Sequence, residues 1–330
     1  MITKDVQFQT FVDKVETAVT DFYGINYQIH IQEIRKTNNV ILTGLTIMEH
    51  NHNVAPTIYL ESFYESYQSG TEFGEIIKQI VKIYENNKMN HTLDVDFFND
   101  YDSVRKKLCF KLIHYDLNRE LLKEVPHIRY LDLAIVFHCA VMNDYIGNGS
   151  ILIHNNHMNN WNVTTKQLLE DAKQNMPRMF PPDMKNMTEI MMEMYRPVKN
   201  EESVFDSGHH CEVTLAGTIV QLQIEQLAES NIQMYVLSNK SGINGAAVLV
   251  YENLLKDLAA LFEHDLYILP SSVHEVIIIP KHEDIDEIFL SQMVNDVNET
   301  KLQAEEILSD HAYLYLKEEN QVISLPLIKE

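Results

Sequence analysis

Leu269-Pro-Ser-Ser-Val-His-Glu-Val-Ile-Ile-Ile-Pro280 places a small polar cluster inside an otherwise apolar stretch. Apolar runs of this kind, bounded by proline, predict two buried strands, and the polar residues between them predict a turn. The cluster consists of Ser271, Ser272, His274 and Glu275. Because buried polar groups need hydrogen-bond partners, these four residues are the first candidate site.

Strands and helices alternate around this segment. Hydrophobic patterning predicts strands at Met234–Ser238, Gly245–Tyr251, Leu266–Leu269 and His274–Ile279, and helices at Glu252–Phe262 and Ile285–Asn298. Similar elements recur from Leu108 to Gln174, and a gapless alignment superposes Leu121-Leu122-Lys123 on Leu254-Leu255-Lys256. This similarity suggests an internal strand-helix-strand-strand-helix duplication. The match is short, so chance similarity is the alternative.

Residues 1–90 predict an N-terminal helix-strand-strand-helix region. Its expected elements are a helix at Asp5–Phe22, strands at Val40–Glu49 and Ala55–Phe63, and a helix at Phe73–Glu85. Residues 91–330 predict a larger α+β region with a Pro/Met-rich helical connection at about 175–211. Since repeated long strand-helix crossovers are absent, we predict an α+β fold with mixed or antiparallel sheets and packed helices. A doubly wound parallel sheet is rejected.

The chain has 330 residues, 45% of them apolar, and a formal net charge of −22. No apolar run reaches the roughly 20 residues of a membrane span, and the first residues lack the apolar block of a secretory signal. We therefore expect a cytoplasmic protein with no membrane partner. The negative charge repels nucleic-acid phosphates, so direct nucleic-acid binding is not expected. The oligomeric state stays open.

The same charge has two interpretations. It provides solubility, as acidic surfaces do in many intracellular proteins, or it presents carboxylates to a basic protein partner. The acidic residues are spread along the chain among lysines and form no long block.

The four residues of the polar turn could also form a hydrolytic site. Nucleophilic catalysis requires a hydroxyl that is hydrogen-bonded to an imidazole, which a carboxylate orients. Adjacent residues on an extended strand point to opposite faces, so Glu275 cannot easily orient His274. The structural alternative is a turn in which Ser271 and Ser272 bond backbone groups and His274 is a satisfied core histidine.

A second polar segment, Ile153-His-Asn-Asn-His-Met-Asn-Asn-Trp161, contains the only tryptophan and precedes a predicted helix. His154, Asn155 and Trp161 are candidate ligand-binding residues at a pocket rim. The alternative is a polar loop that an indole anchors.

Metal and cofactor signals are weak. His209, His210 and Cys211 are the best metal candidates, but they lack the spacing of known zinc motifs, and an exposed loop is the alternative. Phosphate-cradling and dinucleotide-binding glycine motifs are missing, so we expect no cofactor.

Several segments together resemble one family. They include Asn53-Val-Ala-Pro-Thr-Ile-Tyr-Leu-Glu61, Met234-Tyr-Val-Leu-Ser-Asn239, Gly245-Ala-Ala247 and Pro270-Ser-Ser-Val-His-Glu275. This set is similar to the bacterial family of domain of unknown function 5688, over about residue 35 to Tyr315. The resemblance implies a soluble bacterial protein of one architecture and carries no activity, cofactor or catalytic residue.

Two functional hypotheses follow. The leading one is a non-enzymatic acidic protein that engages a basic macromolecular partner, in a phage or defence context. The alternative is a hydrolase or small-molecule enzyme whose pocket joins the Ser271–Glu275 turn to His154, Asn155 and Trp161. That alternative requires a hydroxyl within about 3 Å of an imidazole nitrogen.

Overall fold

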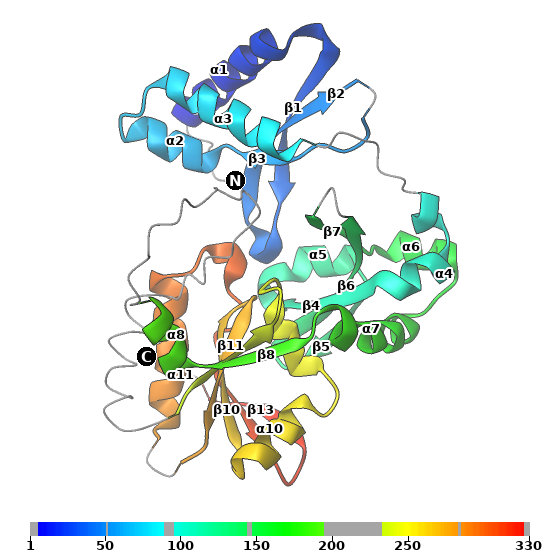
Figure 1. The fold of residues 1–330 in the computed structure, drawn as a ribbon, viewed down its shortest axis with the longest axis vertical. Helices are drawn as coiled ribbons and strands as arrows, with labels where there is room; N and C mark the ends of the chain where they lie inside the picture. Colours follow the sequence, from blue (N-terminus) through cyan, green and yellow to red (C-terminus); the bar gives the residue numbers. More distant parts are fainter. Residues whose placement is uncertain are drawn as a thin grey trace.

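The computed structural model describes residues 6–50, 52–88, 96–143, 147–194, 233–282 and 285–326. Within them, helices pack on three β-sheets, and every strand pair is antiparallel (Figure 1). The predicted α+β class is confirmed, and of the two predicted sheet types the antiparallel one is found. None of the described helices combines the length and apolar character needed to cross a bilayer.

The N-terminal part is a three-stranded sheet covered by helices. Its elements are α1 (Val6–Tyr23), β1 (Tyr27–Arg35), β2 (Ile41–Glu49), β3 (Thr57–Tyr59), α2 (Glu61–Gln68) and α3 (Phe73–Asn87). Among the described residues, its buried core is drawn from residues 11–84 and includes Val15, Leu45 and Ile76, which are fully buried. The part has one more strand and one more helix than predicted. Strand β1 was not predicted, although Tyr27, Ile29 and Ile31 alternate with polar residues in the pattern of a half-buried strand.

A tight 3-10 turn, η2 (Thr37–Asn39), joins β1 to β2 at the tip of a long hairpin. In Figure 1 this hairpin descends from the N-terminal helices toward the rest of the chain. Its tip contacts η5 (Asp116–Asn118) and η7 (Ala304–Glu306). The hairpin thus connects the N-terminal part to two segments that are distant in sequence.

The second sheet is built around one long strand, β6 (Leu133–Asn143). One edge of β6 pairs with β4 (Leu108–His114), and the other pairs first with β5 (His127–Tyr130) and then with β7 (Gly147–Leu152). The helices of this part are α4 (Tyr101–Val104), α5 (Arg119–Glu124), α6 (Asn155–Trp161) and α7 (Thr165–Met179).

The third sheet has six strands in the order β13-β12-β10-β11-β9-β8. These strands are β8 (Pro182–Asn186), β9 (Tyr235–Asn239), β10 (Leu266–Ser272), β11 (Glu275–Pro280), β12 (Tyr313–Leu316) and β13 (Gln321–Ser324). Helices α8 (Met187–Met194) and α11 (Glu287–Thr300) pack against one face. Helix α10 (Leu254–Phe262) packs against the other face together with η6 (Gly245–Val250).

Two predicted features of the C-terminal half differ in the structure. The run Gly245–Tyr251, predicted as a strand, is the 3-10 helix η6, and periodicity alone cannot separate a short, wholly apolar strand from a buried helix. The proposed duplication would place η6 on β4, so the structure does not show the repeat. The predicted helical connection at 175–211 contains the end of α7, the strand β8 and α8, and residues 195–211 lie outside the described part.

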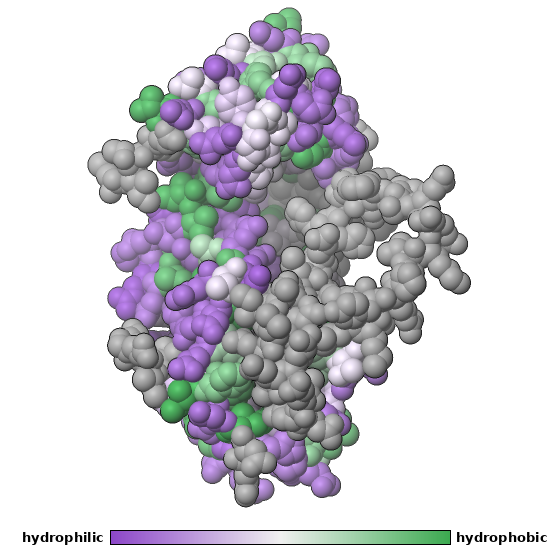
Figure 2. Space-filling model, turned by 90° about the vertical axis from the view of Figure 1, so that its left-hand side faces the viewer, coloured by the Kyte–Doolittle hydropathy of each residue, from purple (hydrophilic) through white to green (hydrophobic). Residues whose placement is uncertain are grey.

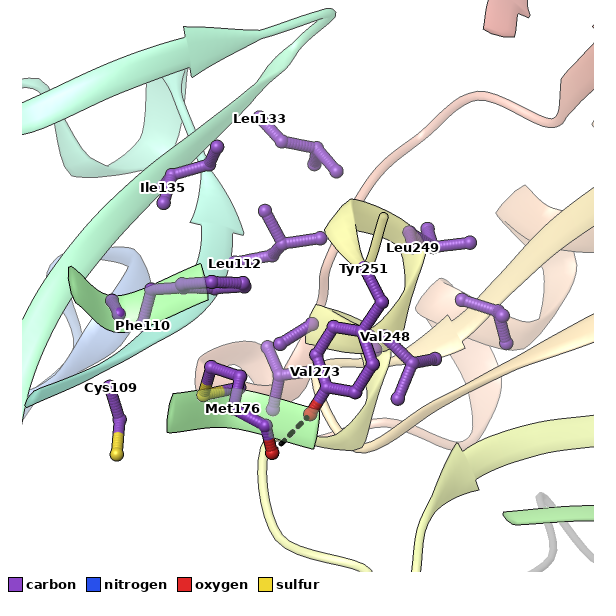
Figure 3. Close-up of a cluster of buried hydrophobic side chains, with 14 of the residues drawn as sticks. Cys109, Phe110, Leu112, Leu133, Ile135, Met176, Val248, Leu249, Tyr251 and Val273 are labelled. Atoms are coloured by element: carbon purple, nitrogen blue, oxygen red, sulfur yellow. Dashed lines mark hydrogen bonds between the residues drawn. The ribbon is translucent and has the colours of Figure 1, made fainter. Parts of the chain in front are cut away.

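The largest core lies between the second and third sheets, with η6 at its centre. Side chains of Phe110 and Leu112 on β4 face Val248 of η6 (Figure 3). Tyr251 extends from the end of η6 toward α7, where its hydroxyl donates to the Phe180 carbonyl at 2.8 Å. This contact fixes the C-terminal end of α7 against the core.

Candidate functional site

The predicted polar turn joins β10 to β11 and is held by neighbouring loops. Ser271 and Ser272 end β10 and are buried, whereas His274 is half-buried. A register shift at the end of β10 sets Ser272 opposite Glu275. The turn is pinned from outside, because the Val273 N–H donates to a carbonyl of η7 at 2.9 Å.

The serine hydroxyls bond within the turn itself. Ser272 Oγ accepts from the backbone N–H of His274 at 3.0 Å, and Ser271 Oγ donates to Glu275 Oε1 at 3.4 Å. Among the described residues, neither hydroxyl is hydrogen-bonded to the His274 ring. The hydroxyl-imidazole-carboxylate contacts of a hydrolase are therefore not formed among these described residues. Of the two hydroxyls, only that of Ser272 bonds a backbone group.

The His274 ring is held as a neutral imidazole. Its Nδ1 accepts from the backbone N–H of Asn244 at 3.2 Å, which leaves the proton on Nε2. That nitrogen lies 4.0 Å from Glu306 Oε1. Burial lowers the pKa of His274, and the Glu306 carboxylate opposes this only in part. The ring thus connects the β9–η6 loop to η7.

His154, Asn155 and Trp161 lie at α6, and each of the latter two uses its polar group structurally. Asn155 Nδ2 donates to the Lys123 carbonyl at 3.0 Å, and the Trp161 indole N–H donates to the Phe98 carbonyl at 3.1 Å. His154 precedes the helix, and its backbone N–H donates to a neighbouring imidazole at 3.0 Å. Among the described residues, no hydrogen bond, ion pair or ring contact joins this segment to the Ser271–Glu275 turn.

The predicted metal candidates His209, His210 and Cys211 lie outside the described residues. Within the described ranges, no group of three or more His, Cys, Asp or Glu side chains is arranged to hold a metal ion.

A different site is found where the second and third sheets meet. A cavity of about 50 Å³ lies among β6, β7, the end of α7 and the β9–η6 loop. Its apolar wall is formed by Phe110, Met176, Phe180 and Ile243. Among the described residues its edge lies at Ser150, which lines the cavity and is exposed. We call it the His138 cavity.

The imidazole of His138, on β6, lines the cavity. Side chains alternate along a strand, and Ala140 pairs with Ser150, so His138, Ala140 and Ser150 share one face. His138 is 8% exposed, and its Nδ1 is sealed from solvent without a hydrogen-bond partner in the described residues. Burial, with a smaller effect of the Lys111 charge, lowers the pKa of His138 to about 3. The ring is therefore neutral at physiological pH.

The opposite rim is a tightly fixed loop. Asn239 is buried, and its side chain accepts from the Ser241 N–H at 2.9 Å and donates to the Ile243 carbonyl at 2.9 Å. Asn244 then adopts a left-handed conformation with φ 50°. Gly245 follows because the loop passes close to the polar turn, where a Cβ would overlap the His274 carbonyl oxygen.

Comparison with known proteins places the chain in a family. The model of a family of unknown function, DUF5688, matches residues 8–317. This chain belongs to that family. No curated protein and no solved structure gives a match.

One feature of the sequence of this DUF5688 protein could have indicated the cavity. His138 interrupts Leu133-Ala-Ile-Val-Phe-His-Cys-Ala140, a run that is otherwise apolar. A lone polar residue in such a run predicts either a buried hydrogen bond or a site. Asn244 gave no comparable signal, since asparagine beside glycine is common in turns. Only the packing of two sheets brings it near His138.

Proposed function

We propose that this DUF5688 protein binds a small ligand in the His138 cavity. The observation that carries the proposal is the buried imidazole of His138, which lines the cavity and whose Nδ1 has no hydrogen-bond partner in the described residues. An unsatisfied buried polar group costs about 1–3 kcal/mol. Because Nδ1 is sealed, a ligand in the cavity would contact the other edge of the ring, and a buried unsatisfied group of this kind calls for an explanation such as a bound molecule nearby.

The walls of the cavity support the same function. Binding pockets combine apolar walls with a few convergent polar groups on a largely rigid frame. Here Met176 and Phe180 provide apolar surface at the end of α7, and Tyr251 fixes that end through hydrogen bonds to both of their carbonyls, at 3.4 and 2.8 Å. Figure 3 shows the Tyr251 side chain directed toward Met176.

Filling the cavity tests this function. Ala140 is 4% exposed and lines the cavity, and valine is well suited to a strand. We expect at least one member of a library of small uncharged fragments to shift the His138 ring signals in NMR spectra of the natural protein. The same fragment should leave those signals unchanged in Ala140→Val. Shifts that persist in a folded Ala140→Val protein, or a library without any effect, would contradict the proposal.

A second candidate function is binding of a basic macromolecule, and the distribution of charge favours it. From Glu252 to Glu319 the sequence has sixteen acidic residues and four lysines, so this segment carries over half of the net charge of −22. Hydrophilic residues also predominate over the described surface on the face shown in Figure 2.

Part of this acidic segment is gathered at one end of the third sheet. The Lys317 backbone N–H donates to Asp265 Oδ1 at 2.9 Å, which brings the β12–β13 turn beside the loop after α10. Glu263, Glu318 and Glu319 are exposed there. We propose this acidic rim as the surface for a basic partner, and charge attraction makes such binding sensitive to salt.

Two triple charge-reversal variants test this surface. One variant carries Glu263→Lys, Glu318→Lys and Glu319→Lys, and the control carries Asp13→Lys, Glu16→Lys and Asp21→Lys on α1. Both change the net charge equally. We expect only the rim variant to lose basic proteins that the natural chain captures at low salt and releases at high salt. Equal loss in both variants would show that net charge alone is responsible.

A further inference from the structure

The polar groups of the His138 cavity are all uncharged, and this restricts the ligand. Among the described residues that line the cavity, none has a charged side chain. A charged ligand would lose its hydration on entry without gaining a counter-charge, which is strongly unfavourable. The nearby ammonium of Lys111 acts on the His138 ring but does not belong to the lining.

The available hydrogen-bonding groups define the ligand further. The amide of Asn239 is used on both its oxygen and its nitrogen by the loop that it closes. Asn244 contributes its backbone N–H to His274, and its side-chain amide has no hydrogen bond in the described residues. A free side-chain amide has both donors and an acceptor, whereas His138 can offer only the ring nitrogen that is not sealed. The complementary ligand group therefore also both donates and accepts.

The volume of the cavity limits the size of the group that can enter it. A cavity needs about 10–15 Å³ of water-accessible volume to hold one water molecule. The 50 Å³ present here thus takes a group of only a few heavy atoms, and the remainder of any larger molecule stays in the opening. The apolar wall from Phe110 to Ile243 suits a short aliphatic stem.

We infer that the His138 cavity binds an uncharged carboxamide on a short aliphatic stem, with His138 and the side chain of Asn244 as its hydrogen-bonding partners. This inference rests on the proposed ligand-binding function and names its chemical class. The amide belongs to a free small molecule or to the end of a larger one, such as a glutamine side chain.

The test compares three probes of nearly equal size: propionamide, propionate and propylammonium. Binding is followed by the NMR signals of the His138 ring in the full-length protein. We expect propionamide to bind at least about tenfold more tightly than either ion. Capped glutamine, with capped glutamate as its control, shows whether an amide on a peptide also enters.

Two matched variants assign the contacts. Asn244→Gly keeps the left-handed backbone and the N–H that bonds His274, but it removes the side-chain amide. Asn253→Gly is its control, because Asn253 is also left-handed, with φ 62°, and lies before α10, outside the cavity lining. We expect propionamide affinity to fall several-fold in Asn244→Gly and to be unchanged in Asn253→Gly.

The outcomes separate the two levels of the proposal. If either ion binds as well as propionamide, and the signal is lost in Ala140→Val, the cavity is a binding site but the carboxamide assignment is wrong. If Asn244→Gly binds propionamide normally, the assigned partner is wrong. If neither the three probes nor the uncharged fragments affect His138, both the ligand class and the ligand-binding function are overturned.

Discussion

Asn38 and Asn118 exchange two hydrogen bonds of 2.7 Å across 80 residues of sequence. The backbone N–H of Asn38 donates to Asn118 Oδ1, and Asn118 Nδ2 donates to Asn38 Oδ1. The Asn38 side chain also donates to the carbonyls of Ala304 and Ile307, again at 2.7 Å. One side chain at the tip of a hairpin therefore connects three separate parts of the chain.

Replacing Asn38 by glycine should weaken this junction specifically. Asn38 has φ 58°, which glycine adopts without strain, so the variant removes the side-chain bonds and keeps the backbone. We expect the free energy of unfolding to fall by about 2 kcal/mol, because three side-chain hydrogen bonds are lost. Chemical denaturation measures it.

The neighbouring residue provides the control for that experiment. Asn39 has nearly the same conformation, with φ 60°, but it is exposed. Asn39→Gly should change stability by less than about 0.5 kcal/mol. Equal losses in the two variants would mean that backbone entropy, and not the junction, is responsible.

His138→Phe should stabilise the protein while removing its ligand contact. The substitution keeps a ring of similar size in the buried strand and eliminates an unpaired polar nitrogen. We expect the free energy of unfolding at pH 7 to rise by about 1 kcal/mol. A loss of stability on calorimetry would mean that the ring has a bonding partner in the folded protein.

The same variant should also alter the dependence of stability on pH. The pKa of His138 is lowered from 6.5 to about 3 in the folded protein, chiefly by burial. Between these pH values the unfolded chain binds a proton that the folded protein does not. The contribution of His138 to the free energy of unfolding is therefore complete above pH 6.5 and is lost as the pH falls toward about 3. The slope from one such group is roughly 1 kcal/mol per pH unit. His138→Phe should show a shallower decline in urea unfolding between pH 7 and pH 5.

Gly245→Ala tests the close approach of the β9–η6 loop to the polar turn. A Cβ at this position would overlap Ser238 Oγ and the His274 carbonyl oxygen, and it would lie 2.9 Å from the Asn239 nitrogen. Two of these atoms belong to backbone and cannot move freely. We expect a loss of about 1–3 kcal/mol in thermal unfolding.

Gly74→Ala is the opposite case and serves as its control. Gly74 lies in the first turn of α3, and nothing lies within 4 Å of a Cβ there. Alanine should stabilise this helix by about 0.5–1 kcal/mol. A similar loss in both variants would exclude the steric explanation for Gly245.

Periodicity predicted the amphipathic helices well and the apolar run at 245–251 poorly. The helix predicted at Phe73–Glu85 is α3 (Phe73–Asn87), because its apolar residues repeat on one face. The segment that begins at Gly245 is apolar throughout, so it has no hydrophobic periodicity that would distinguish a strand from a helix. In the structure it is a 3-10 helix buried between two sheets. Strand β1 has the alternation of a half-buried strand and could have been predicted from it.

The site was less accessible from the sequence than the fold. A turn between two strands was predicted here, but only Val273 and His274 lie outside the strands, and Ser271, Ser272 and Glu275 belong to them. The partners of the serine hydroxyls depend on a register shift that no local pattern encodes. The His138 cavity depends on loops that are about a hundred residues apart and meet only when both sheets have formed. A lone histidine in an apolar strand was the single local sign of it.

The core of the N-terminal part, drawn from residues 11–84, has a consequence for the order of folding during synthesis. Its contacts are short in sequence and can form as soon as that stretch has left the ribosome. The bond from Asn38 to Ala304 spans 266 residues. At about 5–20 residues per second, the hairpin tip waits roughly ten seconds to a minute for that partner. During that interval the tip is open to chaperones and to other nascent chains.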